Sequence, residues 1–295
     1  MSEDGDRVDK LQLHLDKASS ARIYDYMLGG RGPNNYAIDR VFGDDQSGLL
    51  PNMQAAMREN RRFIGRAVET ALQLGVRQFV DIGSGLPSHG QAHQVADRFA
   101  PEAKAHVVYV DNELIANAHS EILLGDEADP ERHQALLADY FAYGQLWRRV
   151  LATGLIDPEQ PVCLLVTALL HFMLPEDEPE IPLAYYRRKL APGSLLVLTH
   201  ALEDREDEGL QEVTRNYGHT TNPSHLRTDE EILRFFGDWE LLEPGLTWTG
   251  LWRPRPDRSV EPWWEEDTRD LPPGEPWWGG DEAKMIYRGG VARNP

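Results

Sequence analysis

The stretch Val-Asp-Ile-Gly-Ser-Gly-Leu-Pro-Ser, at residues 80–88, decides the fold of this 295-residue chain. It follows an apolar run and precedes a helical pattern at residues 91–99, which predicts a strand, a tight glycine turn and a helix. Gly83 and Gly85 let the backbone turn sharply and come close to a ligand. The helix that follows would direct free N–H groups at the same point. Asp81 adds a carboxylate beside the turn, which suits a ligand that carries a cationic amine.

A second acid ends the next apolar segment. Residues 106–111 read His-Val-Val-Tyr-Val-Asp, a pattern that predicts another buried strand. Asp111 lies 26 residues after Gly85, close to the spacing of the ribose-binding acid in nucleotide-binding βαβ units. Two simpler interpretations stay open: the glycine turn only closes a strand against a helix, or Asp111 only caps the helix that begins at Glu113. Together the two signals favour a nucleoside site.

The residues around the glycines favour S-adenosylmethionine over a dinucleotide. A dinucleotide turn has a third small residue that leaves room for a pyrophosphate, whereas here Pro87 stands in the first turn and Ser88 follows it. Asp81 would repel a pyrophosphate and attract the amine of a methionine group. An NAD-dependent oxidoreductase is therefore the weaker alternative.

Composition limits the classes of function. The chain has 30 Lys and Arg residues against 49 Asp and Glu, a formal net charge of −19, which disfavours nucleic-acid binding because that relies on basic side chains. Cys163 is the single cysteine, so no intrachain disulfide can form. The longest apolar run, residues 162–174, is too short to span a bilayer, and no signal peptide is visible. We expect a soluble, cytoplasmic protein with no membrane partner, and the sequence leaves its oligomeric state open.

The N-terminal part contains a segment dense in tyrosine and charge. After a tail at residues 1–18 that we expect to be mobile, residues 20–30 read Ser-Ala-Arg-Ile-Tyr-Asp-Tyr-Met-Leu-Gly-Gly. We interpret residues 19–74 as a helical lid that ends in an amphipathic helix at residues 52–74. Aromatic faces suit a sulfonium cation, and an arginine suits a carboxylate. The candidate lid contacts are Arg22, Tyr24 and Tyr26, with Arg31 as a second choice for the carboxylate. A helix that only docks its tyrosines on the domain explains the pattern equally well.

Further strands would bring polar residues to the same edge of a parallel sheet. They are predicted at residues 135–139, 161–172, 194–200, 239–242 (prolonged by 246–252) and 285–292. Asp139 could accept a hydrogen bond from an adenine amine, with Tyr140 stacking beside it, or it could cap a helix. His171 lies at the carboxyl end of the most apolar segment and is a candidate general base, with a structural role as the alternative. Residues 253–281, rich in Pro and Trp, predict either an ordered surface excursion or a mobile arm.

Five motifs together resemble a known family. The order of elements resembles the class I methyltransferase fold, and the motifs are similar to those of a bacterial S-adenosyl methyltransferase family of largely uncharacterised members. The motifs lie at residues 20–30, 81–87, 108–112, 169–172 and 290–295, so the resemblance covers most of the chain. It implies an α/β, Rossmann-like fold with a seven-stranded, mostly parallel sheet, one antiparallel strand and helices on both faces. The N-terminal helices would form the lid, and residues 75–295 the S-adenosylmethionine-binding domain.

The resemblance also implies roles for individual residues. Asp81, Gly83, Ser84 and Gly85 would hold the methionine part of the cofactor, with backbone at Thr167 and Ala168 completing the amine site. Asp111 would bind the ribose, and Asn112, Asp139 and Tyr140 would surround the adenine. No metal is implied. The resemblance does not supply an acceptor. The nucleoside signals and the acidic composition favour a small molecule, and a non-catalytic S-adenosylmethionine sensor that acts through a partner is the main alternative.

Overall fold

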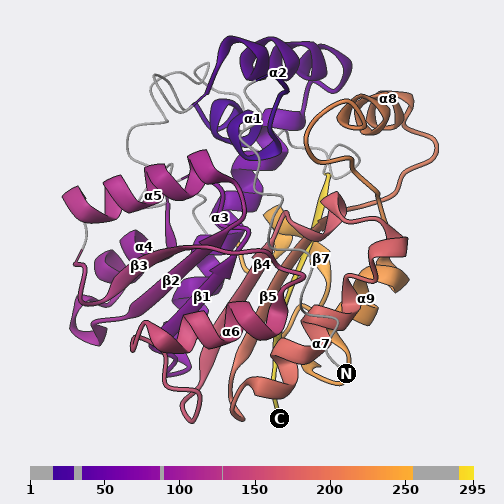
Figure 1. The fold of residues 1–295 in the computed structure, drawn as a ribbon. Helices are drawn as coiled ribbons and strands as arrows, with labels where there is room; N and C mark the ends of the chain where they lie inside the picture. Colours follow the sequence, from indigo (N-terminus) through magenta and orange to yellow (C-terminus); the bar gives the residue numbers. More distant parts are fainter. Residues whose placement is uncertain (1–15, 30–34, 87–89, 128, 255–285) are drawn as a thin grey trace.

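A single sheet runs through the centre of the molecule (Figure 1). The computed structural model describes residues 16–29, 35–86, 90–127, 129–254 and 286–295, and in this part of the chain the sheet has eight strands. The strands are β1 (Gln78–Ile82), β2 (His106–Asp111), β3 (His133–Leu137), β4 (Val162–Thr167), β5 (Leu195–Ala201), β6 (Glu240–Leu241), β7 (Thr247–Trp248) and β8 (Tyr287–Arg293). Their order is β3-β2-β1-β4-β5-β8-β6, with β7 also paired to β8.

The direction of the strands confirms the predicted class of sheet. Strands β1 to β5 pair in parallel, whereas β8 runs antiparallel to β5, β6 and β7. The sheet has eight strands instead of the expected seven, because the segment at residues 239–252 forms two short strands where one prolonged strand was predicted. The N–H of Gly245 donates to the carbonyl of Leu242 at 2.8 Å, and Gly245 has φ +86°. This turn takes the chain away from β8 before it returns as β7.

Helices cover both faces of the sheet, as expected (Figure 1). They are α1 (Ser20–Met27), α2 (Ala37–Leu49), α3 (Met53–Gln73), α4 (Ala92–Phe99), α5 (Leu114–Glu127), α6 (Tyr143–Ala152), α7 (Glu180–Lys189), α8 (Glu208–Tyr217) and α9 (Asp229–Phe236). Because side chains alternate along a strand, β1 sends Phe79 into the core beneath α3, α4 and α5. Its neighbour Val80 enters the core beneath α6, α7 and α9.

A third apolar cluster builds a cap over one end of the sheet. It joins α1, α8 and the first turns of α3 through buried residues that include Ile23, Met57 and Leu210. In Figure 1, α1 and α2 lie beyond the ends of the strands, and α8 lies next to them. The cap places the N-terminal helices above the edge where parallel strands of this kind bind ligands.

The remaining predictions concern the N-terminal tail, the segment rich in Pro and Trp, and the division into a lid and a domain. The tail at residues 1–15 and most of the segment at 253–281 lie outside the described residues. The division into a lid at 19–74 and a domain at 75–295 stays a prediction, although α3 belongs to the core of the sheet as well as to the cap. Within the described ranges no helix combines the length and apolar character that a membrane span needs.

A buried ionic network fastens the cap to the sheet. The Arg22 side chain, 1% exposed, donates from Nε to Oδ2 of Asp39 at 2.8 Å and from Nη1 to Oε1 of Glu113 at 2.5 Å. Its Nη2 donates to the carbonyl of Lys17. Asp39 also accepts hydrogen bonds from the N–H of Ser19 and of Tyr36. Arg22 therefore links α1 to α2 and to the segment between β2 and α5.

Removing Arg22 should destabilise the protein strongly. Arg22→Met would leave Asp39, which is fully buried, without its cation, and breaking such a pair costs about 3–5 kcal/mol of unfolding free energy. Arg215→Met is the matched control, because Arg215 is 65% exposed and pairs with Glu212 on the surface; there we expect less than about 1 kcal/mol. Urea unfolding of both variants measures the difference. Equal losses in the two variants would contradict this role of the network.

Candidate functional site

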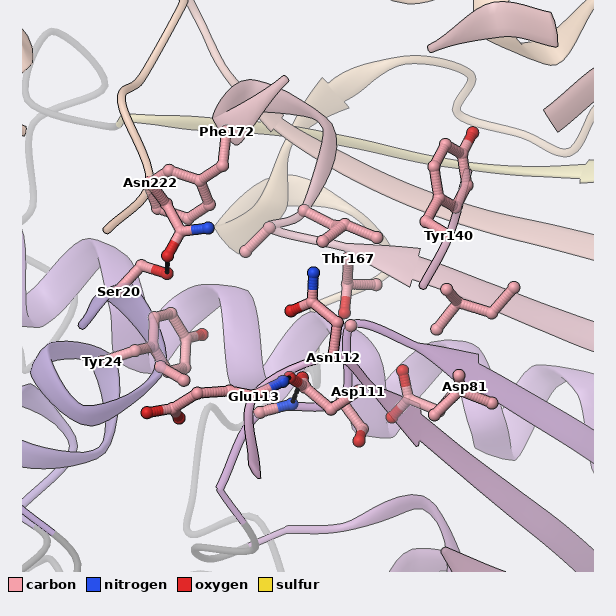
Figure 2. Close-up of a pocket in the computed structure, with 18 of the residues that line it drawn as sticks. Ser20, Tyr24, Asp81, Asp111, Asn112, Glu113, Tyr140, Thr167, Phe172 and Asn222 are labelled. Carbon is pink, nitrogen blue, oxygen red and sulfur yellow. Dashed lines mark hydrogen bonds between the residues drawn. The ribbon is translucent and has the colours of Figure 1, made fainter. Parts of the chain in front are cut away.

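A cavity of about 210 Å³ opens at the carboxyl ends of β1, β2 and β4, beneath the cap. Figure 2 shows the side chains that line it. The lining comprises Ser19, Ser20, Ala21, Tyr24, Asn60, Arg61, Ile64, Asp81, Ile82, Gly83, Ser84, Gly85, Leu86, Val110, Asp111, Asn112, Glu113, Ala138, Asp139, Tyr140, Phe141, Thr167, Ala168, Leu169, Phe172, Met173 and Asn222. Segments far apart in the sequence therefore meet around one space.

The glycine turn forms the floor of the cavity. Gly83 and Gly85 have φ of +74° and +64°, values that L side chains rarely adopt. A Cβ at Gly83 would also lie 2.7 Å from Cδ1 of Leu169, whereas a Cβ at Gly85 would meet only Ala21 at 4.0 Å. The turn is tied to β2, since the N–H groups of Gly83 and Ser84 both donate to the carbonyl of Val110, at 2.8 and 3.1 Å. Glycine is required at both positions by the backbone angle, and at Gly83 by space as well.

Asp111 braces the turn and also faces the cavity. Its Oδ2 accepts from the N–H of Gly85 at 2.8 Å, and its Oδ1 accepts from the N–H of Glu113 at 2.8 Å. The capping contact considered from the sequence is therefore present. Each carboxylate oxygen has a second lone pair, so these bonds leave capacity for ligand hydroxyls. Burial raises the pKa of Asp111, while hydrogen bonds from the backbone at Glu113, Gly85 and Asn112 oppose the rise.

Asp81 lines the same cavity but, unlike Asp111, accepts no hydrogen bond from the described residues. It is 3% exposed, and no hydrogen bond from any described residue reaches it; its Oδ1 is buried without a partner. Burial raises the pKa of Asp81 to about 7, the positive charge of Arg61 opposes this, and the charge of Asp111 adds to it. A buried carboxyl with no donor is costly, and a cationic ligand group beside it would remove that cost.

Asp139 and Tyr140, which come shortly after β3, line the cavity, but their polar groups already form hydrogen bonds within the protein. Oδ1 of Asp139 accepts from the N–H of Phe141 at 2.9 Å, while α6 is preceded by Ala142 and not by Asp139. The hydroxyl of Tyr140 donates to the carbonyl of Pro179 at 2.6 Å. This bond fixes the ring of Tyr140, and Tyr140 is one of the residues that line the cavity.

The chain after β4 makes a strained turn at the cavity. Ala168 has φ +49°, a conformation that costs energy for a non-glycine residue and tends to occur at functional sites. The N–H of Ala168 donates to Oγ1 of Thr199 at 2.9 Å, which holds the turn against β5. Thr167 and Ala168 both line the cavity, as predicted.

Three predicted site residues lie outside the lining. Arg22 is engaged in the buried network described above, so its guanidinium faces Asp39 and Glu113. Tyr26 donates its hydroxyl to Oδ1 of Asp44 at 2.7 Å on the exposed side of the cap. His171 packs among Phe172, His200 and Tyr287, and burial together with the charge of Arg227 lowers its pKa to about 3. Their predicted roles stay predictions, and the environment of His171 disfavours proton uptake.

Several lining residues were not singled out from the sequence. The polar ones are Ser19, Ser20, Asn60, Arg61, Glu113 and Asn222. Only Arg61 carried a local signal: it lies four residues after Met57 and three before Ile64, within the apolar stripe of its helix. A charged side chain on a buried stripe indicates a special environment. Asn222 is brought in by the loop after α8, and its Oδ1 accepts from the hydroxyl of Ser20 at 3.1 Å.

Comparison with known proteins decides the family. The sequence profile of a family described as S-adenosyl methyltransferase matches residues 6–295. The chain belongs to this S-adenosyl methyltransferase family. No curated protein matches it at a significant level. The enzyme is thus an S-adenosylmethionine-dependent methyltransferase by family, which disfavours the NAD-dependent alternative.

Two crystal structures are similar over nearly the whole chain. A DUF574 family protein from Streptomyces avermitilis is 32% identical, with a TM-score of 0.82, and the match covers 95% of this methyltransferase and 98% of that chain. A candidate methyltransferase from Thermobifida fusca is 30% identical, with a TM-score of 0.78, over 95% and 96% of the two chains. Both agree with a class I methyltransferase fold, and neither description names a methyl acceptor.

Asp81→Asn should stabilise the ligand-free methyltransferase at alkaline pH. Between the ordinary pKa of 3.8 and the folded value of about 7, the unfolded chain releases a proton that the folded chain keeps. Stability from this group is therefore complete below pH 3.8 and is lost as the pH rises to about 7. An asparagine cannot ionise, so we expect a gain at pH 8 of up to ~4 kcal/mol that vanishes near pH 4.

Urea unfolding from pH 4 to 8 measures this gain. Asp204→Asn is the control, because Asp204 is an exposed acid whose side chain accepts only from the N–H groups of Glu206 and Asp207 in its own loop. We expect no comparable pH-dependent gain there. A gain for Asp81→Asn that stayed the same at every pH would refute ionisation as its cause.

Proposed function

We propose that the cavity binds S-adenosylmethionine and that the enzyme methylates a small, uncharged or cationic acceptor held under the cap. The observation that carries the first part is the buried, unpartnered Asp81 beside a glycine turn that is itself braced by Asp111. A ligand with an amine for Asp81 and hydroxyls for Asp111 would satisfy both carboxylates. At Gly85 the turn leaves space beside the backbone for that ligand, since a Cβ there would meet only Ala21 at 4.0 Å.

The remaining lining residues fit the other parts of the cofactor. Asp111 would accept hydrogen bonds from the ribose hydroxyls, using the lone pairs that the backbone bonds leave free. Asn112, Asp139 and the ring of Tyr140 would surround the adenine, since they extend the lining from the same sheet edge. The backbone at Thr167 and the strained turn at Ala168 would lie beside the amine. When bound, the cofactor supplies an electrophilic methyl group on a sulfonium.

The acceptor end of the cavity is proposed from its chemistry. In Figure 2, Ser20, Phe172 and Asn222 lie together, away from Asp81, and the Ser20–Asn222 hydrogen bond bridges α1 to the loop after α8. Leu169 and Met173 add apolar surface to the lining. These side chains are neutral and mostly apolar, so they suit a flat or aliphatic molecule. Their task would be to align the nucleophile and to exclude water.

The charge of the whole lining argues against anionic acceptors. It contains four carboxyl residues, Asp81, Asp111, Glu113 and Asp139, and among the described lining residues the single cationic side chain is Arg61. A phosphate or carboxylate on the acceptor would meet net negative charge in a site with little solvent to screen it. Nucleic acid is disfavoured for the same reason.

Titration calorimetry tests the cofactor site. We expect S-adenosylmethionine and S-adenosylhomocysteine to bind the wild type, and Asp111→Asn to weaken both by about tenfold or more, because a charge-assisted hydrogen bond contributes about 1.5–3 kcal/mol. The exposed control Asp204→Asn should bind like the wild type. If the wild type binds neither ligand at millimolar concentration, the proposed site is wrong.

Methyl transfer from radiolabelled S-adenosylmethionine tests the acceptor class. A panel would pair neutral phenols and amines with the same compounds bearing a carboxylate or phosphate, and would include RNA and DNA. Because of the acidic lining, we expect transfer to neutral or cationic members to exceed transfer to their anionic partners. Preferred methylation of the anionic members or of nucleic acid would reject this part of the proposal.

A further inference from the structure

The acceptor end of the cavity is built from three segments that hydrogen bonds hold together. We call the side chains that line it the acceptor wall: Ser20 from α1, Leu169, Phe172 and Met173 from the turn after β4, and Asn222 from the loop after α8. The N–H of Thr221 donates to the carbonyl of Ala18 at 3.1 Å, and the hydroxyl of Ser20 donates to Asn222. The loop after α8 is therefore tied to the start of α1 at two points.

The same loop is tied to the turn after β4. Arg227, 5% exposed, donates from Nη1 to the carbonyl of Leu170 at 2.8 Å and from Nη2 to the carbonyl of Met173 at 2.9 Å. These two bonds hold the single turn of 3₁₀ helix that carries Phe172. The backbone of Phe172 is thus fixed relative to the loop that carries Asn222.

One polar group of the acceptor wall is open to a ligand. Oδ1 of Asn222 accepts from the hydroxyl of Ser20 at 3.1 Å and from that of Thr221 at 2.6 Å, which fixes the orientation of the amide. Its Nδ2 donates to no described residue, and in Figure 2 this nitrogen points away from Ser20 and toward the interior of the cavity. Both hydroxyl hydrogens are used, so Nδ2 is the hydrogen-bond donor that this wall offers.

An aromatic ring lies beside this donor. Phe172 is half-buried, and its ring centroid lies 4.3 Å from that of His171 and 5.6 Å from that of Tyr217. These contacts hold the ring in place, and in Figure 2 it lies next to the amide of Asn222. A second aromatic ring can pack on such a surface, offset or edge to face. The wall thus combines a fixed aromatic surface with one fixed donor.

We propose that Asn222 determines which acceptors this methyltransferase takes: Nδ2 donates a hydrogen bond to a neutral oxygen of an aromatic acceptor whose ring packs against Phe172. A carbonyl, ether or hydroxyl oxygen has the lone pair that an N–H needs, whereas a protonated amine has none. Of the neutral and cationic acceptors that the charge of the lining permits, the wall selects the neutral ones that carry oxygen. This inference rests on the proposed function and adds the residue that recognises the acceptor.

Three compounds of nearly the same shape test the selectivity of the wall. Acetophenone has a ring and a neutral carbonyl, α-methylstyrene has a CH₂ in place of the carbonyl oxygen, and protonated 1-phenylethylamine has a cation there. In wild-type protein saturated with S-adenosylhomocysteine, acetophenone should bind about fivefold more tightly than either of the others, because one neutral hydrogen bond contributes about that much. Titrations followed by saturation-transfer NMR measure the three dissociation constants.

Three variants of the wall give different expected results. Asn222→Leu should bind acetophenone and α-methylstyrene equally, because the donor is gone. Asn222→Asp should prefer the amine to acetophenone, since a carboxylate accepts from an ammonium and cannot donate. Phe172→Leu should weaken all three compounds by a similar factor, because each of them contains the ring.

Asn216→Leu is the matched control. Asn216 lies outside the lining, and its Nδ2 already donates to Oε1 of Gln46 at 3.1 Å. This variant removes an amide of the same kind from the neighbouring helix, so it should keep the wild-type preference for acetophenone. Loss of the preference in Asn216→Leu as well as in Asn222→Leu would show a general effect of the region and overturn the role of Asn222.

The outcomes separate this inference from the proposed cofactor site. If the wild type does not bind S-adenosylhomocysteine, the cofactor site is wrong and this inference falls with it. If it binds S-adenosylhomocysteine but none of the three ring compounds, or binds α-methylstyrene as tightly as acetophenone, the inference is wrong and the cofactor site stands. A wild-type preference for the amine would place the amide oxygen in the cavity and would also overturn the inference. These wild-type comparisons decide the matter even if a variant fails to fold.

Discussion

The tie between the glycine turn and the end of β2 is the constraint on which the site depends. The carbonyl of Val110 accepts two N–H groups of the turn, and the carboxylate of Asp111 accepts a third from Gly85. Three donors of a tight turn are thereby satisfied by one neighbouring strand, which fixes the turn without filling the space above it. The parallel register that pairs Asp81 with Tyr109 brings β1 and β2 to the same edge. The cavity exists because the turn is held from the side.

Several ionisable groups above this floor are buried, and they differ in whether other side chains compensate their charge. Around Arg22 every charge has a partner, so burial there is compensated and the network serves to join helices. Around Arg61 and Asp81, buried atoms of both side chains have no hydrogen-bond partner among the described residues, so burial there is compensated only in part. A buried charge without a partner carries a desolvation cost in the ligand-free protein. A ligand that pairs with this charge removes the cost, and the free energy of binding becomes more favourable by that amount.

Local patterns predicted the parts of the structure that local physics determines. Alternating or continuous apolar runs identified β1, β2, β4 and β5, and the glycine turn with Asp111 indicated the sheet edge at which the cavity lies. The contacts of Arg22 were not predictable, because Asp39 and Glu113 lie 17 and 91 residues away along the chain. Asn222 reaches the cavity through an irregular loop that carries no periodic signal. The split of residues 239–252 into β6 and β7 follows from a turn whose backbone angle the apolar pattern does not encode.

The Arg22 network also affects how the cavity can be entered. Glu113 accepts the guanidinium of Arg22 from the cap while its own N–H donates to Asp111 on the floor, so one residue belongs to both. Lifting α1 would separate Arg22 from Glu113 and would loosen the strand end at the same time. In this structure both contacts of Glu113 are made, so the cap and the floor of the cavity are joined through one side chain and its own backbone. A route into the cavity that lifts α1 would have to break the buried Arg22–Glu113 ion pair, and the free energy that this step costs belongs to the protein and not to the ligand.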